Sequence, residues 1–196
     1  MGLAIMVLGL ALFIGAHLFV TRREARAALI ARWGEGPYKV AFSLVSAVGI
    51  VLIGYGFARY RATGWVDLWS PPTWTRHVAV LLMWPAVIAL FAAYLPGHIR
   101  RILKHPMLVG VKLWALAHLI ANGDLGSVIL FGAFLAWAVY DRIVVKRREQ
   151  AGLPTPLQDG LGWRNDIVAV LVGTLVYLAL GYLFHPLVIG VPAFTA

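Results

Sequence analysis

Two histidines and two lysines lie within one largely apolar stretch of the chain, Lys104 to Asp124, which reads KHPMLVGVKLWALAHLIANGD. His105 precedes a proline at the start of the stretch, Lys112 lies in its middle, and His118 lies near its end. Burying an imidazole or an ammonium group in hydrocarbon without a partner is costly. The stretch is long enough to cross most of a bilayer as a helix, so we expect these side chains to face protein, ligand or water. It is the first candidate for a functional site.

The histidines are the residues with the clearest chemical use. The chain has six histidines and no cysteine, which excludes thiolate ligands and thiol catalysis. Imidazoles from facing helices are the usual ligands of haem iron in membrane bundles, which raises the possibility of a bound haem b. His17, His105 and His118 also have ordinary explanations: an interfacial residue, a helix cap and a core histidine bonded to a carbonyl. The other three could lie at the membrane interface or in a basic loop: His77, His98 and His185.

Lys112 is the only lysine inside an apolar run. It lies seven residues after His105, hence on the same helix face about two turns away. Its ammonium group could snorkel towards the membrane surface, or it could pair with a haem propionate or another anion. Three basic residues just before the stretch could pair with the same kind of anion: Arg100, Arg101 and Lys104.

The elements that must position these residues are membrane helices. The 196-residue chain is 61% hydrophobic, and its mean hydropathy is +0.83, which is more apolar surface than a soluble domain could bury. Backbone groups in lipid must be satisfied within their own segment, so the spans are helices. The sequence therefore predicts an all-α integral membrane protein, a single domain over residues 1–196. We expect six spans: 2–20, 38–58, 76–95, 106–122, 125–141 and 166–185.

Short signals predict how the spans are joined and packed. The fourth and fifth spans are linked by only Asn122-Gly123-Asp124, which predicts a tight hairpin with Gly123 as a C-terminal cap and Asp124 as an N-cap. The first loop is amphipathic enough to continue the first helix along the membrane surface until residues 34–37 break it. Small residues four apart predict close helix packing at two places: Ala11 with Gly15, and Gly132 with Ala136.

The net charge of +9 follows the positive-inside rule and does not indicate nucleic-acid binding. Thirteen Lys and Arg residues lie in the first, third and fifth loops, and three lie in the second loop. This asymmetry predicts an inner-membrane protein with both termini in the periplasm. Its expected partners are membrane lipids and an apolar small molecule. The chain contains no phosphate-binding glycine loop, no dinucleotide fingerprint and no H-E-x-x-H zinc motif.

The block from Lys104 to Arg142, together with residues 15–17 and 32–39, resembles the NnrU family of bacterial membrane proteins. This family is associated with denitrification and nitric oxide metabolism. Its plant relative is 15-cis-zeta-carotene isomerase, a membrane enzyme that uses haem b and histidine ligands. The resemblance implies that His17 and His118 correspond to the proposed iron ligands. The cysteine of the plant enzyme's redox-linked ligand switch has no counterpart here.

A weaker resemblance leads to a second class of function. Lys104-His105-Pro106 followed by Gly110 is similar to the R-H-P-x-Y-x-G motif of isoprenylcysteine carboxyl methyltransferases, although Leu108 replaces the tyrosine. The acidic pair expected downstream is replaced by Lys-Arg-Arg-Glu at 146–149. The alternatives to a haem-dependent isomerase are therefore a methyltransferase-like membrane enzyme and a non-enzymatic assembly factor for denitrification complexes.

Depth in the membrane leaves the ligand pair open. At 1.5 Å per residue, His17 lies about 5 Å from the cytoplasmic edge of its helix and His118 about 18 Å from the same edge. Two ligands of an upright haem should be level. His118 is level with His77 or His185. His17 is level with His98 or His105. The pair His17 and His118 is expected from the resemblance alone.

Overall fold

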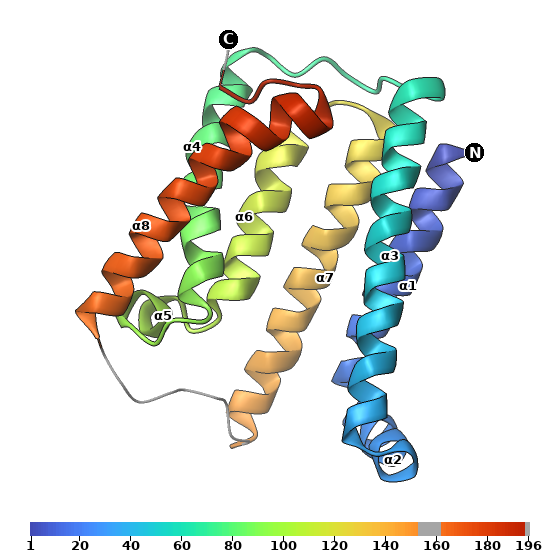
Figure 1. Cartoon of the computed structure of the whole chain (residues 1–196), viewed down its shortest axis with the longest axis vertical. Coiled ribbons are helices and arrows are strands. Elements are labelled where there is room, and N and C mark those ends of the chain that lie inside the picture. The colour runs from blue at the N-terminus through green and yellow to red at the C-terminus, as the bar shows by residue number, and fades with distance from the viewer. Residues whose placement is uncertain (153–161, 195–196) are drawn as a thin grey trace. The chain divides into compact units, whose positions relative to one another are not determined.

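The computed structural model describes residues 1–152 and 162–194, and this part of the chain is built from helices (Figure 1). The only β-type pairing in it is an isolated bridge between Asp67 and Asp124. The helices are, in order, α1 (Gly2–Thr21), α2 (Arg23–Trp33), α3 (Glu35–Thr63), α4 (Trp74–Ala92), α5 (His98–Leu103), α6 (Pro106–Ala121), α7 (Leu125–Gln150), α8 (Trp163–Ala179) and the π-helix η1 (Leu180–Ile189). The predicted all-α class is confirmed.

Five helical segments in the described part are long and apolar enough to cross a membrane, and α6 is a shorter apolar helix. Each predicted span coincides with one of these six elements. Helices α3 and α7 extend beyond the predicted ranges 38–58 and 125–141, because both continue into charged, interfacial sequence. The last span is α8 continued by η1. The chain is thus an integral membrane protein that crosses the bilayer several times.

The chain divides into two compact units, each of which is described by itself. The first contains Met1–Trp69 and Asp124–Trp137, hence α1, α2, α3 and the first half of α7. The second contains Ser70–Gly123 and Ala138–Ala196, hence α4, α5, α6, the second half of α7, α8 and η1.

In the first unit, α1 and α3 run antiparallel with their backbones in contact. A Cβ atom added at Gly9 would lie 2.6 Å from the backbone N of Ile53, and one at Gly56 would overlap the backbone N of Met6. Glycine at these positions removes the side chain that would hold the helices apart, which is how small residues stabilise membrane helix pairs.

The predicted sites of close packing were wrong. In the described part of the chain, no atom lies within 4 Å of a Cβ added at Gly15 or at Gly132. Four-residue spacing of small residues occurs on lipid-facing and packed faces alike, so the spacing alone does not identify the contact. The glycines at the contact between α1 and α3 are Gly2, Gly9, Gly49 and Gly56.

The first loop forms α2, a helix separate from α1, and Gly34 ends it. The backbone of Gly34 has φ +85°, a conformation that favours glycine. Gly36 and Pro37, also predicted as helix breakers, instead lie in the first turn of α3. Proline is tolerated there because the first helical N–H groups have no intrahelical acceptor.

The short link at residues 122–124 follows the prediction for Asp124 but not for Gly123. Asp124 caps α7, since its Oδ1 accepts the Ser127 N–H at 2.9 Å. Gly123 is not in the left-handed conformation of a capping glycine. Instead, the Asn122 Nδ2 donates to the His118 carbonyl at 2.8 Å, and this bond supplies a donor to a carbonyl in the last turn of α6.

In the second unit, α4 contacts both α6 and α8. Gly110 of α6 packs on α4, where an added Cβ would lie 2.9 Å from the Ala86 carbonyl oxygen. On the other side, the Trp84 Nε1 donates to the Thr174 Oγ1 at 2.9 Å, and the Tyr177 hydroxyl donates to the Val80 carbonyl at 3.1 Å. Two buried helix pairs therefore fix α6 and α8 on either side of α4.

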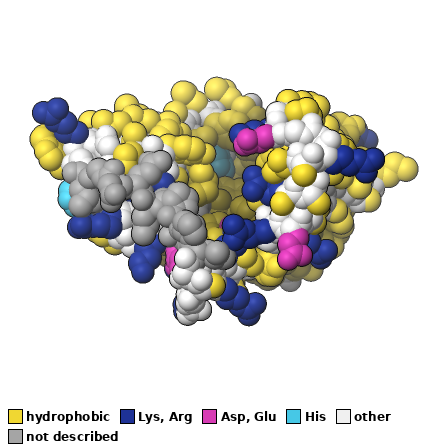
Figure 2. Space-filling view, turned by 90° about the horizontal axis from the view of Figure 1, so that it is seen from below, with side chains coloured by type: hydrophobic (Ala, Val, Ile, Leu, Met, Phe, Trp, Pro, Cys, Tyr) yellow, Lys and Arg dark blue, Asp and Glu magenta, His cyan; other side chains and the backbone are white. Residues whose placement is uncertain are grey.

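In the first unit, α2, which carries basic residues of the first loop, lies where α1 ends and α3 begins; in the second unit, α5, which carries Arg100 and Arg101, lies where α4 ends and α6 begins (Figure 1). Lys and Arg side chains are exposed on the face seen in Figure 2. In the second unit, short helix α5 is held at this end by Asp166 of α8, whose carboxylate accepts the backbone N–H groups of His98 and Ile99 at 3.0 and 2.9 Å.

Candidate functional site

His118 lies on α6 in the second unit, and a backbone hydrogen bond sets its orientation. Its Nδ1 is 2.8 Å from the Trp114 carbonyl oxygen, one turn earlier. A carbonyl can only accept, so Nδ1 carries the proton and Nε2 is the nitrogen with a lone pair. Metal-binding histidines usually have this arrangement, in which one nitrogen donates to a carbonyl and the other coordinates the metal.

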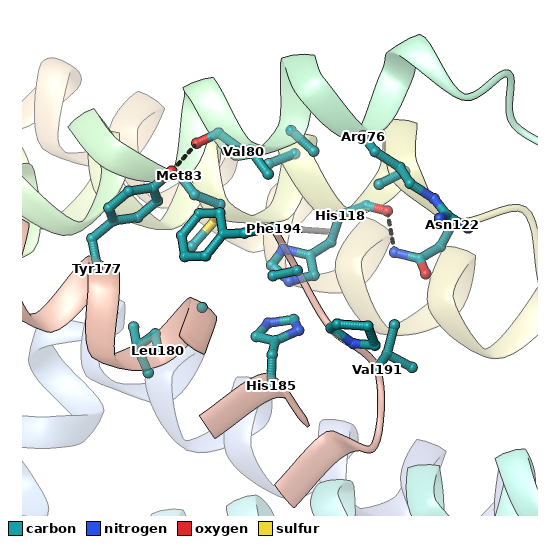
Figure 3. Close-up of a pocket in the computed structure, with 16 residues that line it drawn as sticks. Arg76, Val80, Met83, His118, Asn122, Tyr177, Leu180, His185, Val191 and Phe194 are labelled. Atoms are coloured by element: carbon teal, nitrogen blue, oxygen red, sulfur yellow. Dashed lines mark hydrogen bonds between the residues drawn. The ribbon is translucent and has the colours of Figure 1, made fainter. Parts of the chain in front are cut away.

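His185 lies on η1, where the regular helix widens. Pro186 lacks an N–H and crowds the preceding turn, which accounts for a π-type segment at this place. The helix ends at Gly190, which has φ +76°. There the chain turns back, and Val191 N–H donates to the His185 carbonyl at 3.2 Å. This turn brings the segment 191–194 across the cavity described below (Figure 3).

The imidazoles of His118 and His185 point toward one another (Figure 3). Their ring centroids are 6.1 Å apart and their planes are inclined by 30°. A metal–imidazole bond is about 2 Å long, and the ring centre lies about 1 Å beyond the nitrogen, so two imidazoles on opposite sides of one iron have centres roughly 6 Å apart. The pair therefore fits the spacing of two axial haem ligands.

A cavity of about 170 Å³ surrounds this pair, whereas one water needs roughly 10–15 Å³. Most of its lining is apolar, with Arg76 and Asn122 beside one another at one edge (Figure 3). Phe194, carried by the C-terminal segment, packs on Tyr177 and Tyr182 with centroid distances of 5.3 and 4.6 Å. The lining consists of Arg76, Ala79, Val80, Met83, Ala117, His118, Ala121, Asn122, Tyr177, Leu180, Gly181, His185, Val191, Pro192, Ala193 and Phe194.

His17 belongs to the first unit and lies among aromatic rings. Its Nδ1 is 2.7 Å from the Phe13 carbonyl oxygen, so this histidine also presents Nε2 away from its helix. The ring lies 5.1 Å from Phe42 and 5.4 Å from Trp137. The Trp137 Nε1 is buried without a hydrogen-bond partner among the described residues. Since His17 and His118 are in different units, their pairing stays a prediction.

His105 takes part in a polar cluster at the basic end of the second unit. Its Nε2 lies 2.6 Å from the Glu149 Oε1, and Arg142 contacts the same carboxylate at 3.5 Å. His105 occupies the N-cap position of α6, but its side chain makes no capping hydrogen bond. His105 is thus the N-cap residue that its place before Pro106 suggested, but its imidazole binds Glu149 and not the helix end.

The basic residues considered as anion partners do not line the cavity. Its described lining contains neither Lys112 nor Arg100 nor Arg101. The arginine in the described lining is Arg76, at the start of α4, and its place in the sequence does not single it out. An arginine at the edge of an apolar span is a common interfacial residue, so its sequence position alone does not indicate a site. The pairing of α4 with α6 brings it to Asn122.

His98 and His77 have other surroundings. The His98 Nδ1 lies 2.8 Å from the Asp166 Oδ2, at the joint between α5 and α8. His77 is exposed near the start of α4. In residues 1–152 and 162–194, no three His, Asp or Glu side chains are grouped as a metal-ion site.

Comparison with curated proteins and with solved structures found no match. Residues 5–193, which extend through both units and include every histidine, match the NnrU protein family. The predicted resemblance is confirmed: the chain belongs to the NnrU family.

Proposed function

We propose that this chain is a haem-b-binding membrane protein that acts on an apolar substrate by redox-linked or isomerase chemistry. The observation that carries the proposal is the facing pair His118 and His185 in an apolar cavity, with a spacing that suits two axial ligands. Bound haem would supply an iron centre able to exchange an electron with a substrate or to polarise it. A role in nitric oxide or denitrification metabolism rests on the family resemblance.

The protein's own residues have separate tasks in this proposal. The Trp114 carbonyl fixes the tautomer and the rotation of the His118 ring. The apolar residues around the rings exclude water and leave room for a flat, apolar molecule. His185 would be the second residue to hold the haem, and it lies on a π-type segment that ends in a glycine turn.

The proposal is tested by purifying the protein from haem-replete cells and measuring haem per chain. About one haem b per chain is expected, with a sharp Soret band. A colourless protein that also fails to take up added haem would rule the proposal out.

We further propose that the protein lies in the bacterial inner membrane with both termini in the periplasm. The support is the charge asymmetry of thirteen against three basic loop residues. A reporter that is active only in the periplasm, fused after Ala196, should give signal. The same reporter inserted after Glu149 should give none; the opposite pattern would reverse the orientation.

One observation favours the methyltransferase-like alternative. Glu149, in the part of the chain where that group has its acidic pair, contacts His105 of the K-H-P motif at 2.6 Å. Under this alternative the protein should bind S-adenosylmethionine in calorimetry at micromolar concentration, and His105→Ala should abolish the binding. An assembly factor would bind neither haem nor S-adenosylmethionine and would co-purify with a denitrification complex.

A further inference from the structure

The cavity around His118 and His185 differs in polarity from one end to the other. At one edge, the Arg76 guanidinium lies beside the Asn122 side chain (Figure 3). At the far edge, the lining is Val80, Met83 and Phe194. The two imidazoles lie between these edges. A molecule that fills the whole cavity would therefore meet a charged end, two nitrogen donors and an apolar end.

The charge at the polar edge is positive and is not balanced within the lining. Among the residues that the structure describes, no Asp or Glu lines the cavity. The Asn122 amide is already engaged, because its Nδ2 donates to the His118 carbonyl. Arg76 is exposed at this edge, so an anionic group on a ligand could pair with it, and the planar guanidinium suits a carboxylate because it can donate two parallel hydrogen bonds.

We propose that the cavity selects an apolar molecule that carries a carboxylate at one edge, and that Arg76 binds this carboxylate and so sets the direction in which the ligand enters. Two molecules have this chemistry: haem b, through its propionates, and a long-chain fatty acid. Binding of haem b at this site rests on the proposed function above, whereas binding of a fatty acid is independent of it.

The test compares haem b with its dimethyl ester, in which both carboxylates are neutral. Each is titrated into the full-length protein in lipid nanodiscs, and absorption gives the dissociation constant. Arg76→Gln should weaken haem b binding roughly five- to tenfold, because Arg76 is partly solvated and its ion pair is screened. The same substitution should leave binding of the dimethyl ester unchanged.

Arg59→Gln is the matched control. It removes an exposed arginine near the end of α3, in the first unit, that does not line the cavity, so neither dissociation constant should change. If Arg76→Gln weakens haem and its ester equally, Arg76 has only a structural role and the inference fails. The inference also fails if Arg76→Gln changes neither constant.

A second titration with a fluorescent fatty acid separates the two ligands. If the wild-type protein binds no haem but binds the fatty acid in an Arg76-dependent manner, the haem function is wrong and the carboxylate site stands. If haem binds and the fatty acid does not compete with haem for the cavity, the carboxylates that Arg76 binds are the haem propionates. If neither ligand binds, both proposals are overturned.

Discussion

Purified His118→Ala protein is expected to contain no six-coordinate haem. The substitution removes an imidazole that the Trp114 carbonyl holds in place. Loss of an outer-shell partner alone reduces metal affinity roughly 10–100-fold, and loss of the coordinating ring should cost more than about 100-fold. The measurement is the absorption spectrum after purification and after addition of haem, which should show either no Soret band or a five-coordinate, high-spin form.

His77→Ala is the control for this result, since His77 is exposed and does not line the cavity. Its spectrum should equal that of the wild-type protein. A His118→Ala protein that keeps an unchanged low-spin spectrum would remove His118 from the ligand set.

The second large effect is expected at the contact between α1 and α3. A Cβ at Gly56 would overlap the Met6 backbone and would lie 2.9 Å from the Gly2 carbonyl oxygen. Backbone atoms cannot move aside as a flexible side chain can, so Gly56→Leu must force the two helices apart. Overpacking usually costs about 1–3 kcal/mol, and here we expect the upper end or more, because a whole helix pair is separated.

Gly54→Leu provides a close control two residues away on the same helix. In the described part of the chain, nothing lies within 4 Å of a Cβ added at Gly54, so its leucine should point into lipid. Both proteins are compared by their yield after size-exclusion chromatography and by their thermal unfolding midpoints. Gly54→Leu should resemble the wild-type protein, and Gly56→Leu should aggregate or unfold at a much lower temperature. Equal midpoints would show that the close α1–α3 contact does not stabilise the unit.

The positions of the membrane helices could be predicted from the sequence, and so could the Asp124 cap. Lipid forces every spanning segment to be apolar and helical, so hydropathy and length locate it. Asp124 is recognisable because a short polar link between two spans must cap the helix that follows it. Both signals are local to their segments.

The helix contacts could not be predicted in the same way. A membrane helix is apolar on the lipid face as well as on the packed face, so the hydrophobic pattern does not distinguish Gly54 from Gly56. The same limit applies to the cavity. Arg76, Asn122 and His185 come from three different elements, and only the pairing of α4 with α6 and of α4 with α8 brings them together.

His105 illustrates a related limit. Its place before Pro106 suggests a cap, whereas its actual partner, Glu149, is 44 residues away in the chain. A histidine can serve many roles, and its sequence neighbours do not select among them. The same reasoning explains why depth along the helices left His185 as one of two level partners for His118.

The proposed haem site is tested most directly through the identity of its second ligand. The measurement is the reduced-minus-oxidised absorption spectrum of His185→Ala and His17→Ala proteins, each purified from haem-replete cells. We predict that His185→Ala loses the low-spin bands and that His17→Ala keeps them. Low-spin bands that persist in His185→Ala and disappear in His17→Ala would contradict the assignment and would place the second ligand in the first unit.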